Sequence, residues 1–188
     1  MSKDKQSEAP PTVLTIGHST RTIEEFIRLL KAHGVTCIVD VRTVPRSRRN
    51  PQFNRETLPA SLQAVGIAYI HMAALGGLRR PKPDSINTGW RNASFRGYAD
   101  YMQTPEFRTT LEKLLLLAKK QRVALMCAEA VPWRCHRSLI ADALVAREIP
   151  TEHIMSESRR DAHALRSFAK RTGIYLTYPS EEPQTELL

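Results

Sequence analysis

The stretch VALMCAEAVPWRCHRSLIADALVA, residues Val123 to Ala146, decides how we interpret the rest of the chain. Its first five residues form a compact apolar run with the length of a strand. Its last dozen residues repeat Leu, Ile, Ala and Val at helical spacing, from Leu139 to Leu144. The stretch therefore predicts a buried strand that leads through a short loop into a helix.

The loop between this strand and this helix is rich in groups that can do chemistry. These groups are Cys127, Glu129, Arg134, Cys135, His136 and Arg137. If the loop caps the helix, the backbone N–H groups of residues 135–138 are unpaired donors, and the positive end of the helix dipole adds to them. We therefore predict an anion site at the start of this helix.

The remainder of the chain alternates short apolar runs with segments of helical spacing. Strands are predicted at 13–16, 37–41, 67–72, 123–127 and 152–155, and helices at 22–33, 56–65, 95–102 and 105–120. We also expect a helix over 159–171 and an edge strand over 174–178. The alternation predicts an α/β fold with a mostly parallel sheet of about five strands and helices on both faces.

A length of 188 residues suits a single domain. We expect a flexible leader at 1–11, an α/β domain at 12–178 and a disordered tail at 179–188. No apolar run approaches the roughly 20 residues that cross a bilayer, so we expect a cytoplasmic protein. Its three cysteines are odd in number and form no Cys-x-x-Cys pair, so we expect reduced thiols.

The formal net charge is +9, and part of the excess is clustered in two loops, at Arg46 to Arg49 and at Arg79 to Lys82. Such a surface attracts phosphate-bearing partners, so the predicted partner is an anionic small molecule or a nucleic acid, and not a membrane. The alternative is that these are ordinary solvated basic loops. Charge alone does not choose between the two interpretations.

Polar residues follow four of the predicted strands. His18 and Ser19 come after the first strand, Asp40 and Arg42 stand at the end of the second, His71 ends the third, and Cys127 with Glu129 follows the fourth. In an open parallel sheet, ligands bind outside the carboxyl ends of the strands. We therefore expect these side chains to share one edge of the sheet.

Several segments resemble one protein family. TIGHSTRTIEEFIRLLKAHG, VDVRTVPRSRRNPQFN, the ALGG near Leu75 and CAEAVPWRCHRSLIADAL are similar, in this order, to the domain-of-unknown-function 488 family over Val13 to Ile154. The family's Cys-Ala-Glu and Cys-His-Arg pattern falls on residues 127–129 and 135–137. The resemblance implies an α/β domain with a shared pocket, and it implies no established reaction.

Four residues are candidate catalytic groups. Glu129 is a candidate general base, and the alternative is an ion pair with Arg137. Cys135 near the helix start is a candidate thiolate, or a small side chain that packs the helix. His18 is a candidate ligand or catalyst, or a turn residue that bonds its own backbone. Asp40 is a candidate catalyst, or the partner of a nearby arginine.

Five residues are candidate substrate-binding groups, because they are basic or hydroxylic and are expected near the strand ends or the helix start. They are Ser19, Arg42, Arg46, His136 and Arg137. The sequence identifies no cofactor.

Three classes of function fit these residues, in this order of preference. The first is an enzyme that acts on a phosphate-bearing substrate, for example a nucleotide or nucleic acid. The second is a non-catalytic nucleic-acid binder in which Phe53 or Trp90 stacks on bases. The third is a zinc or iron site made of His18, Cys135 and His136 or Glu129. Adjacent Cys135 and His136 would point about 100° apart on a helix, which disfavours the third class.

Overall fold

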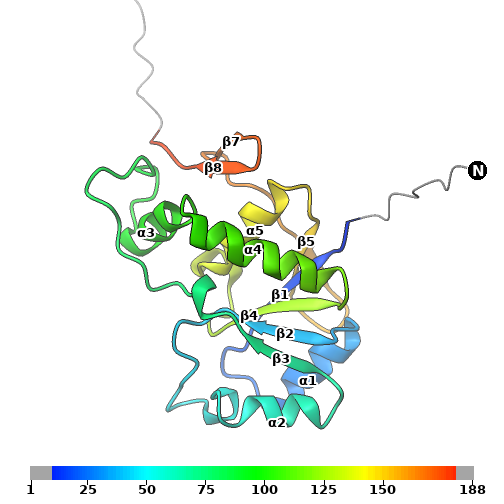
Figure 1. Ribbon diagram of the computed structural model, residues 1–188. Coiled ribbons are helices and arrows are strands. Elements are labelled where there is room, and N and C mark those ends of the chain that lie inside the picture. The colour runs from blue at the N-terminus through cyan, green and yellow to red at the C-terminus, as the bar shows by residue number, and fades with distance from the viewer. Residues whose placement is uncertain (1–9, 181–188) are drawn as a thin grey trace, which may run out of the picture.

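A mostly parallel sheet of six strands forms the centre of the molecule in the computed structural model, which describes residues 10–180 (Figure 1). The strand order is β3-β2-β4-β1-β5-β6, and only β6 runs antiparallel to its neighbour. The strands are β1 (Val13–Gly17), β2 (Cys37–Asp40), β3 (Ala68–His71), β4 (Val123–Cys127), β5 (Thr151–Ile154) and β6 (Arg160–Ala162). The predicted α/β class is confirmed, with one strand more than the predicted five.

Helices cover both faces of this sheet (Figure 1). One face carries α1 (Ile23–Ala32) and α2 (Leu58–Gln63), and the other carries α3 (Ala93–Tyr101), α4 (Pro105–Ala118) and α5 (Arg137–Val145). Successive strand residues point to opposite faces, so Ile38 packs under α1 and α2 whereas Val39 packs under the other three helices. Apolar side chains on both faces of the strands thus give the protein two hydrophobic cores.

The ends of α1 follow the predicted capping pattern. The Thr22 side chain accepts a hydrogen bond from the Glu25 N–H over 3.1 Å at the start of the helix. Gly34 has a φ of 64°, the left-handed conformation that ends helices and that glycine adopts without steric cost. The first signal positions the loop that joins β1 to α1, and the second positions the turn that joins α1 to β2.

The predicted helix over 159–171 was wrong. This segment contributes β6, which pairs with β5, and then β7 (Lys170–Thr172). The segment's helical spacing of apolar residues is overridden because β5 offers an open sheet edge, and Arg160 also pairs with Glu152 over 3.0 Å. Tertiary pairing outweighs a weak local preference here.

The predicted strand over 174–178 exists as β8 (Tyr175–Thr177), but it does not join the edge of the main sheet. It pairs with β7 in a separate two-stranded hairpin. The predicted leader at 1–11 and tail at 179–188 lie largely outside the described residues. Among the described residues of the predicted tail, Ser180 has its hydroxyl 3.1 Å from that of Thr88, so this segment contacts the long loop after β3.

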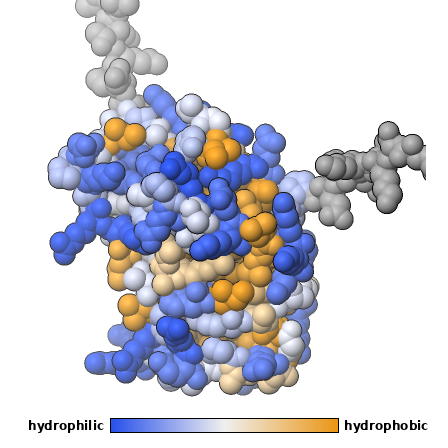
Figure 2. Space-filling model, viewed as in Figure 1, coloured by the Kyte–Doolittle hydropathy of each residue, from blue (hydrophilic) through white to orange (hydrophobic). Residues whose placement is uncertain are grey.

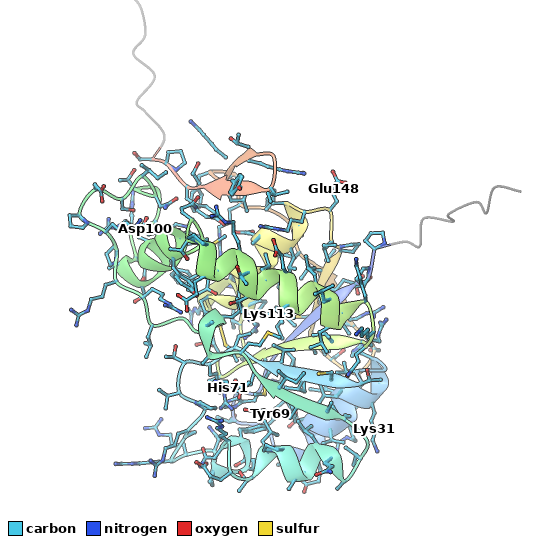
Figure 3. All side chains as sticks on the ribbon, in the orientation of Figure 1. Lys31, Tyr69, His71, Asp100, Lys113 and Glu148 are labelled. Carbon is cyan, nitrogen blue, oxygen red and sulfur yellow. A yellow bond between two sulfur atoms is a disulfide. The ribbon has the colours of Figure 1, made fainter. Side chains whose placement is uncertain are left out.

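The long loop at 76–92 has no helix or strand, but hydrogen bonds hold it in place. Buried Asp100 on α3 accepts hydrogen bonds from the Lys82 N–H, the Ser85 hydroxyl and the Asn87 amide (Figure 3). Asn87 in turn accepts a bond from the Tyr178 N–H over 2.9 Å. The loop therefore has a defined course beside the carboxyl end of the sheet.

Hydrophilic residues cover most of the viewed face of the protein, with apolar residues gathered in smaller areas (Figure 2). Within residues 10–180, no helix combines the length and the apolar character needed to cross a membrane.

Candidate functional site

A cavity of about 840 Å³ opens at the carboxyl ends of β1, β2 and β4. Seven of the nine predicted site residues line it: His18, Ser19, Arg42, Arg46, Glu129, Cys135 and His136. Asp40 and Arg137 lie behind the wall and do not line it. The expectation that polar strand ends gather at one edge of the sheet therefore agrees with the structure.

Asp40 and Arg42 form a buried ion pair below the cavity. The two oxygens of Asp40 accept bonds from Nε and Nη2 of Arg42 over 2.9 and 2.6 Å, and Asp40 is fully buried. Tyr69 donates a further bond to this carboxylate over 2.7 Å, and His71 bonds the Arg42 carbonyl oxygen over 2.8 Å. Tyr69 and His71 are two residues apart on β3 and share one side of it (Figure 3). This network fixes Arg42.

His18 belongs to the same network. Its Nδ1 lies 2.8 Å from the Ser19 carbonyl oxygen, which can only accept, so the ring proton is on Nδ1. Its Nε2 therefore accepts from Nη1 of Arg42 over 3.2 Å. Burial lowers the pKa of His18 to about 4, and the ring stacks on Phe53 at 4.3 Å. Both nitrogens of the neutral ring are thus engaged within the protein.

Glu129 lies in the loop after β4, and its side chain is exposed to the cavity. The hypothesis of an ion pair with Arg137 was wrong, because Arg137 binds the main-chain carbonyl oxygen of Glu129 instead. Within residues 10–180 the Glu129 carboxylate forms no ion pair, and it accepts one weak bond from the Val131 N–H over 3.4 Å. The carboxylate is therefore available to a molecule in the cavity.

The loop that carries Glu129 sits close to β1 and is held by Arg137. A Cβ atom at Gly17 would lie within 1.9 Å of the Glu129 carbonyl oxygen, so only glycine permits this approach. Arg137 is 1% exposed, and its Nη2 donates to the Ala130 carbonyl oxygen over 2.9 Å. Burial lowers the pKa of Arg137 to about 10. Arg137 is thus placed to shape the loop from behind.

The two cysteines of the motif meet at the inner end of the cavity. The structure joins the sulfur atoms of Cys127 and Cys135 as a disulfide, contrary to the expected reduced thiols. The two Cα atoms are 7.7 Å apart. That separation is wider than the roughly 4.4–6.8 Å that disulfides span. Cys37, the third cysteine, is the first residue of β2 and is buried and free in the core.

His136 faces these sulfur atoms. Its Nε2 lies 2.9 Å from the Val41 carbonyl oxygen and must donate to it, so Nδ1 carries the lone pair. Nδ1 lies 3.6 Å from the sulfur of Cys135. A Cβ atom at Gly77 would come within 2.5 Å of Nδ1, so the glycine leaves room for the ring. Burial lowers the pKa of His136 to about 4, which keeps the ring neutral.

The donor atoms of Cys127, Cys135 and His136 all lie within 4.8 Å of one another. The metal set considered from the sequence was His18, Cys135 and His136 or Glu129; the cluster in the structure shares Cys135 and His136 with it and adds Cys127. The objection that Cys135 and His136 diverge was wrong, because Cys135 precedes α5 in an extended conformation, with φ −128° and ψ 144°. The helical angle between neighbours does not apply there.

Three of the four backbone donors of the anion site predicted at the helix start already have partners. The Cys135 N–H donates to the Pro132 carbonyl oxygen over 3.1 Å, within the short 3₁₀ turn at Pro132–Arg134. The Ser138 N–H donates to the Cys135 carbonyl oxygen over 3.0 Å, and the Arg137 N–H points to the sulfur of Cys135 at 3.5 Å. An anion site at this helix start stays a prediction, with the His136 N–H as the one of its four donors that has no partner among the described residues.

Positive charge reaches the cavity from side chains. Arg46, Arg49 and Arg134 line it, and all three are exposed. Ion pairs elsewhere in residues 10–180 involve other arginines, and none involves these three. Glu129 is the one acidic side chain among the described lining residues. The cavity is therefore electropositive.

Sequence reasoning missed several cavity residues and misjudged two aromatics. Val44, Leu78 and Phe95 line the cavity, but apolar residues in loops of irregular spacing give no signal in a sequence. Cys127 was placed among the reactive groups at the strand ends, but it was not named as a candidate catalytic or binding residue. Phe53 is fully buried and Trp90 is 8% exposed, so neither can stack on a base.

Comparison with known protein families finds a match that covers the motifs that line this cavity. No curated protein and no solved structure matches the chain. A family profile described as "Domain of unknown function DUF488" matches residues 22–144, from the cap of α1 to α5. The matched range holds the Cys-Ala-Glu and Cys-His-Arg segments and Arg42. The chain therefore belongs to the DUF488 family.

Proposed function

We propose that this protein is an enzyme that binds a phosphate-bearing small molecule, such as a nucleotide, in the cavity. The observation that carries the proposal is that one cavity holds both positively charged side chains and potentially reactive groups. Arginines without ion-pair partners among the described residues line a cavity that ends at two cysteine sulfurs and a neutral imidazole. Charge for binding and groups for reaction thus lie within reach of one ligand.

Anion recognition rests on four arginines. Arg46, Arg49 and Arg134 can donate charge-assisted hydrogen bonds, which are the strong ones, to phosphate oxygens. Arg42 uses all but one of its guanidinium N–H groups on Asp40, His18 and the Phe53 carbonyl oxygen. Because Arg42 lines the cavity, we assign its remaining N–H to the orientation of a bound phosphate.

The lining also favours a ligand with an apolar or planar part. Val44 and Leu78 are 63% and 78% exposed, although both are large apolar side chains. Phe95, which stacks on Trp90 at 4.8 Å, lies on the same wall. A base or another apolar group attached to the phosphate would cover these side chains, which is why we favour a nucleotide-like molecule over inorganic phosphate.

Glu129 is the proposed proton-transfer residue. Its carboxylate is exposed to the cavity, has no ion pair among the described residues, and follows Cys127 by two positions. A carboxylate in this position can accept a proton from a nucleophile or give one to a leaving group. His18 has no nitrogen left for this work, so we assign it the positioning of Arg42.

The test is a binding and turnover assay with a panel of nucleotides and sugar phosphates. Binding is followed by the rise in melting temperature, and turnover is followed by phosphorus NMR. Arg134→Ala should weaken binding about tenfold or more, because a hydrogen bond from a charged group is lost. Glu129→Gln should retain binding and lose about 10²- to 10⁴-fold in turnover.

Arg48 provides the matched control. It is exposed and lies between Arg46 and Arg49, but it does not line the cavity. Arg48→Ala should bind the ligand as the unaltered protein does. If Arg48→Ala and Arg134→Ala weaken binding equally, the attraction is general surface charge and the proposal fails. Single-stranded oligonucleotides belong in the same panel, since preferential binding of them would favour the nucleic-acid alternative.

A further inference from the structure

We propose that Cys127, Cys135 and His136 form a metal site for a zinc-like divalent ion, with an open coordination position that faces the cavity. The donor set is two sulfurs and one imidazole nitrogen, and all three residues line the cavity. Thiolate and imidazole ligands suit zinc and related borderline ions, and three protein ligands with one open position are typical of catalytic zinc sites.

The orientation of His136 is the first argument. The ring donates its Nε2 proton to the Val41 carbonyl oxygen over 2.9 Å, which leaves the Nδ1 lone pair directed at the sulfur atoms. Histidines that bind metals commonly donate their other ring N–H to a backbone carbonyl in this way. The backbone of the loop after β2 thus fixes both the tautomer and the direction of the ligand nitrogen.

The surroundings of the sulfur atoms are the second argument. The sulfur of Cys127 accepts from Nη1 of Arg137 over 3.2 Å and from the Glu129 N–H over 3.4 Å. The sulfur of Cys135 accepts from the Arg137 N–H over 3.5 Å. N–H groups directed at sulfur stabilise thiolates, which is the form that binds metal.

The charge of Arg137 is the third argument. Its guanidinium is almost fully buried, and no carboxylate lies within ion-pair distance of it among the described residues, although the charge of Glu129 acts to raise its pKa. The sulfur of Cys127 is the side-chain atom that its Nη1 contacts. A thiolate at Cys127 would be the stronger acceptor for this buried N–H, and thiolate is the form that binds metal.

The separation of the two backbones is the fourth argument. The Cα atoms of Cys127 and Cys135 are 7.7 Å apart. A disulfide normally needs them within about 6.8 Å, so the bond that joins the two sulfurs spans an unusually wide gap. The metal site needs the two thiols that reduction of this bond releases, and metal–sulfur bonds of about 2.3 Å to an ion between the sulfurs suit the wide separation of the two backbones.

This inference deepens the proposed function, since the open position of the ion would face the bound phosphate compound. The ion would supply Lewis-acid chemistry there, and Glu129 lies two residues from Cys127 on the same cavity wall. Metal binding can be measured without any substrate, so the two proposals fail separately.

The experiment is a titration of the full-length reduced protein with Co²⁺, a spectroscopic probe for zinc sites. We expect one equivalent to bind, with thiolate-to-cobalt charge-transfer absorption and the visible bands of a tetrahedral ion, and Zn²⁺ should displace it. Cys127→Ser, Cys135→Ser and His136→Ala should each weaken binding by more than the roughly 10–100-fold typical of losing an outer partner.

Two controls keep the test specific. Cys37→Ala removes the cysteine that lies outside the cluster, and His33→Asn removes a histidine that belongs neither to the cluster nor to the cavity lining. Both should bind Co²⁺ as the unaltered protein does. Circular dichroism of each variant checks that it folds.

A measurement on the unaltered protein does not depend on variants. Bound Zn²⁺ should protect Cys127 and Cys135 from iodoacetamide. The folded protein is alkylated with and without Zn²⁺ and then denatured, and peptide mapping identifies which cysteines were labelled. Absence of bound Co²⁺ and Zn²⁺ in the reduced protein, unchanged binding by Cys127→Ser, or a disulfide that persists under reductant would overturn the metal site. If Co²⁺ binds but its spectrum does not respond to added inorganic phosphate or nucleotide, the open position is overturned.

Discussion

Arg137 donates a hydrogen bond to the sulfur of Cys127 over 3.2 Å, and only 1% of Arg137 is exposed. The same guanidinium holds the carbonyl oxygens of Glu129 and Ala130. One side chain from α5 therefore supports both the sulfur cluster and the loop that carries the candidate acid–base residue. This contact links the shape of the cavity wall to the chemistry at its inner end.

Replacement of Arg137 should damage stability and metal binding together. Arg137→Met leaves the carbonyl oxygens of Glu129 and Ala130 without this donor, which should lower the free energy of unfolding by about 2–4 kcal/mol in urea denaturation. It also removes an outer partner of Cys127, so Co²⁺ affinity should fall about 10–100-fold. Arg137→Lys keeps the charge and should lose less of both. Equal Co²⁺ affinity in Arg137→Met and the unaltered protein would contradict the role we assign to this arginine.

A side chain at position 77 should displace the His136 ring while it leaves both cysteines unaltered. Gly77→Ala places a methyl group within 2.5 Å of Nδ1, so the ring must move and Co²⁺ affinity should fall. Gly173→Ala is the matched control, because this glycine lies in the β7–β8 hairpin with open space around it. Its φ of 59° makes that substitution cost stability, while the Co²⁺ spectrum should stay unchanged. A normal spectrum for Gly77→Ala would show that the ring position is not critical.

Asp40 should matter more than Tyr69 for the fixed orientation of Arg42. Asp40→Asn leaves a buried guanidinium without its counter-charge, which should cost about 3–5 kcal/mol in unfolding free energy. Tyr69→Phe removes one hydrogen bond and keeps the ion pair, so it should cost only about 1 kcal/mol. Chemical denaturation of both variants measures the difference, and similar losses would show that the charge of Asp40 is not what holds this network.

Stability should fall as the pH is lowered from about 6.5 towards 4. Burial lowers the pKa of His153 to about 4, whereas an unfolded histidine titrates near 6.5. Between these values histidine is protonated in the unfolded chain and neutral in the folded chain. The free energy of unfolding therefore decreases as the pH falls, by at most about 1.4 kcal/mol per pH unit for one group. His18 adds to the same slope. Above about pH 6.5 neither histidine contributes a slope.

The variant His153→Gln tests this dependence, because glutamine does not titrate. His153 lies in a chain of hydrogen bonds from Thr15 through His163 to Asp142. The variant should therefore lose stability at neutral pH but show a shallower slope between pH 6.5 and 4, as measured by melting temperature. Parallel slopes for the two proteins would exclude His153 as a source of the acid sensitivity.

The fold was predictable where local signals and tertiary pairing agree. Apolar runs gave β1 to β5 and capping residues gave α1, because the same residues satisfy both the strand or helix and the core. The segment 159–171 shows the opposite case. Its helical spacing was real, but pairing with β5 and the contact between His163 and Asp142 decide its conformation, and neither is visible in the local sequence.

The candidate site was predictable in position and less so in detail. The rule that ligands gather at the carboxyl ends of parallel strands brought His18, Arg42 and Glu129 to the correct edge. Which residues pair there depends on side-chain directions that spacing does not give. Cys135 was treated as helical, so its approach to His136 was missed, and exposed arginines supply positive charge to the cavity.

The strand order has a consequence for how the protein is made. β4 inserts between β2 and β1, so the two central strands come from opposite parts of the chain. Such non-local parallel pairing is slow to form. A nascent chain that has not yet released β4 and α5 from the ribosome holds His18 and Arg42 without the strand that lies between β1 and β2. The cavity thus comes into existence only after most of the polypeptide has been synthesised, and shortened forms that end before α5 would lack it entirely.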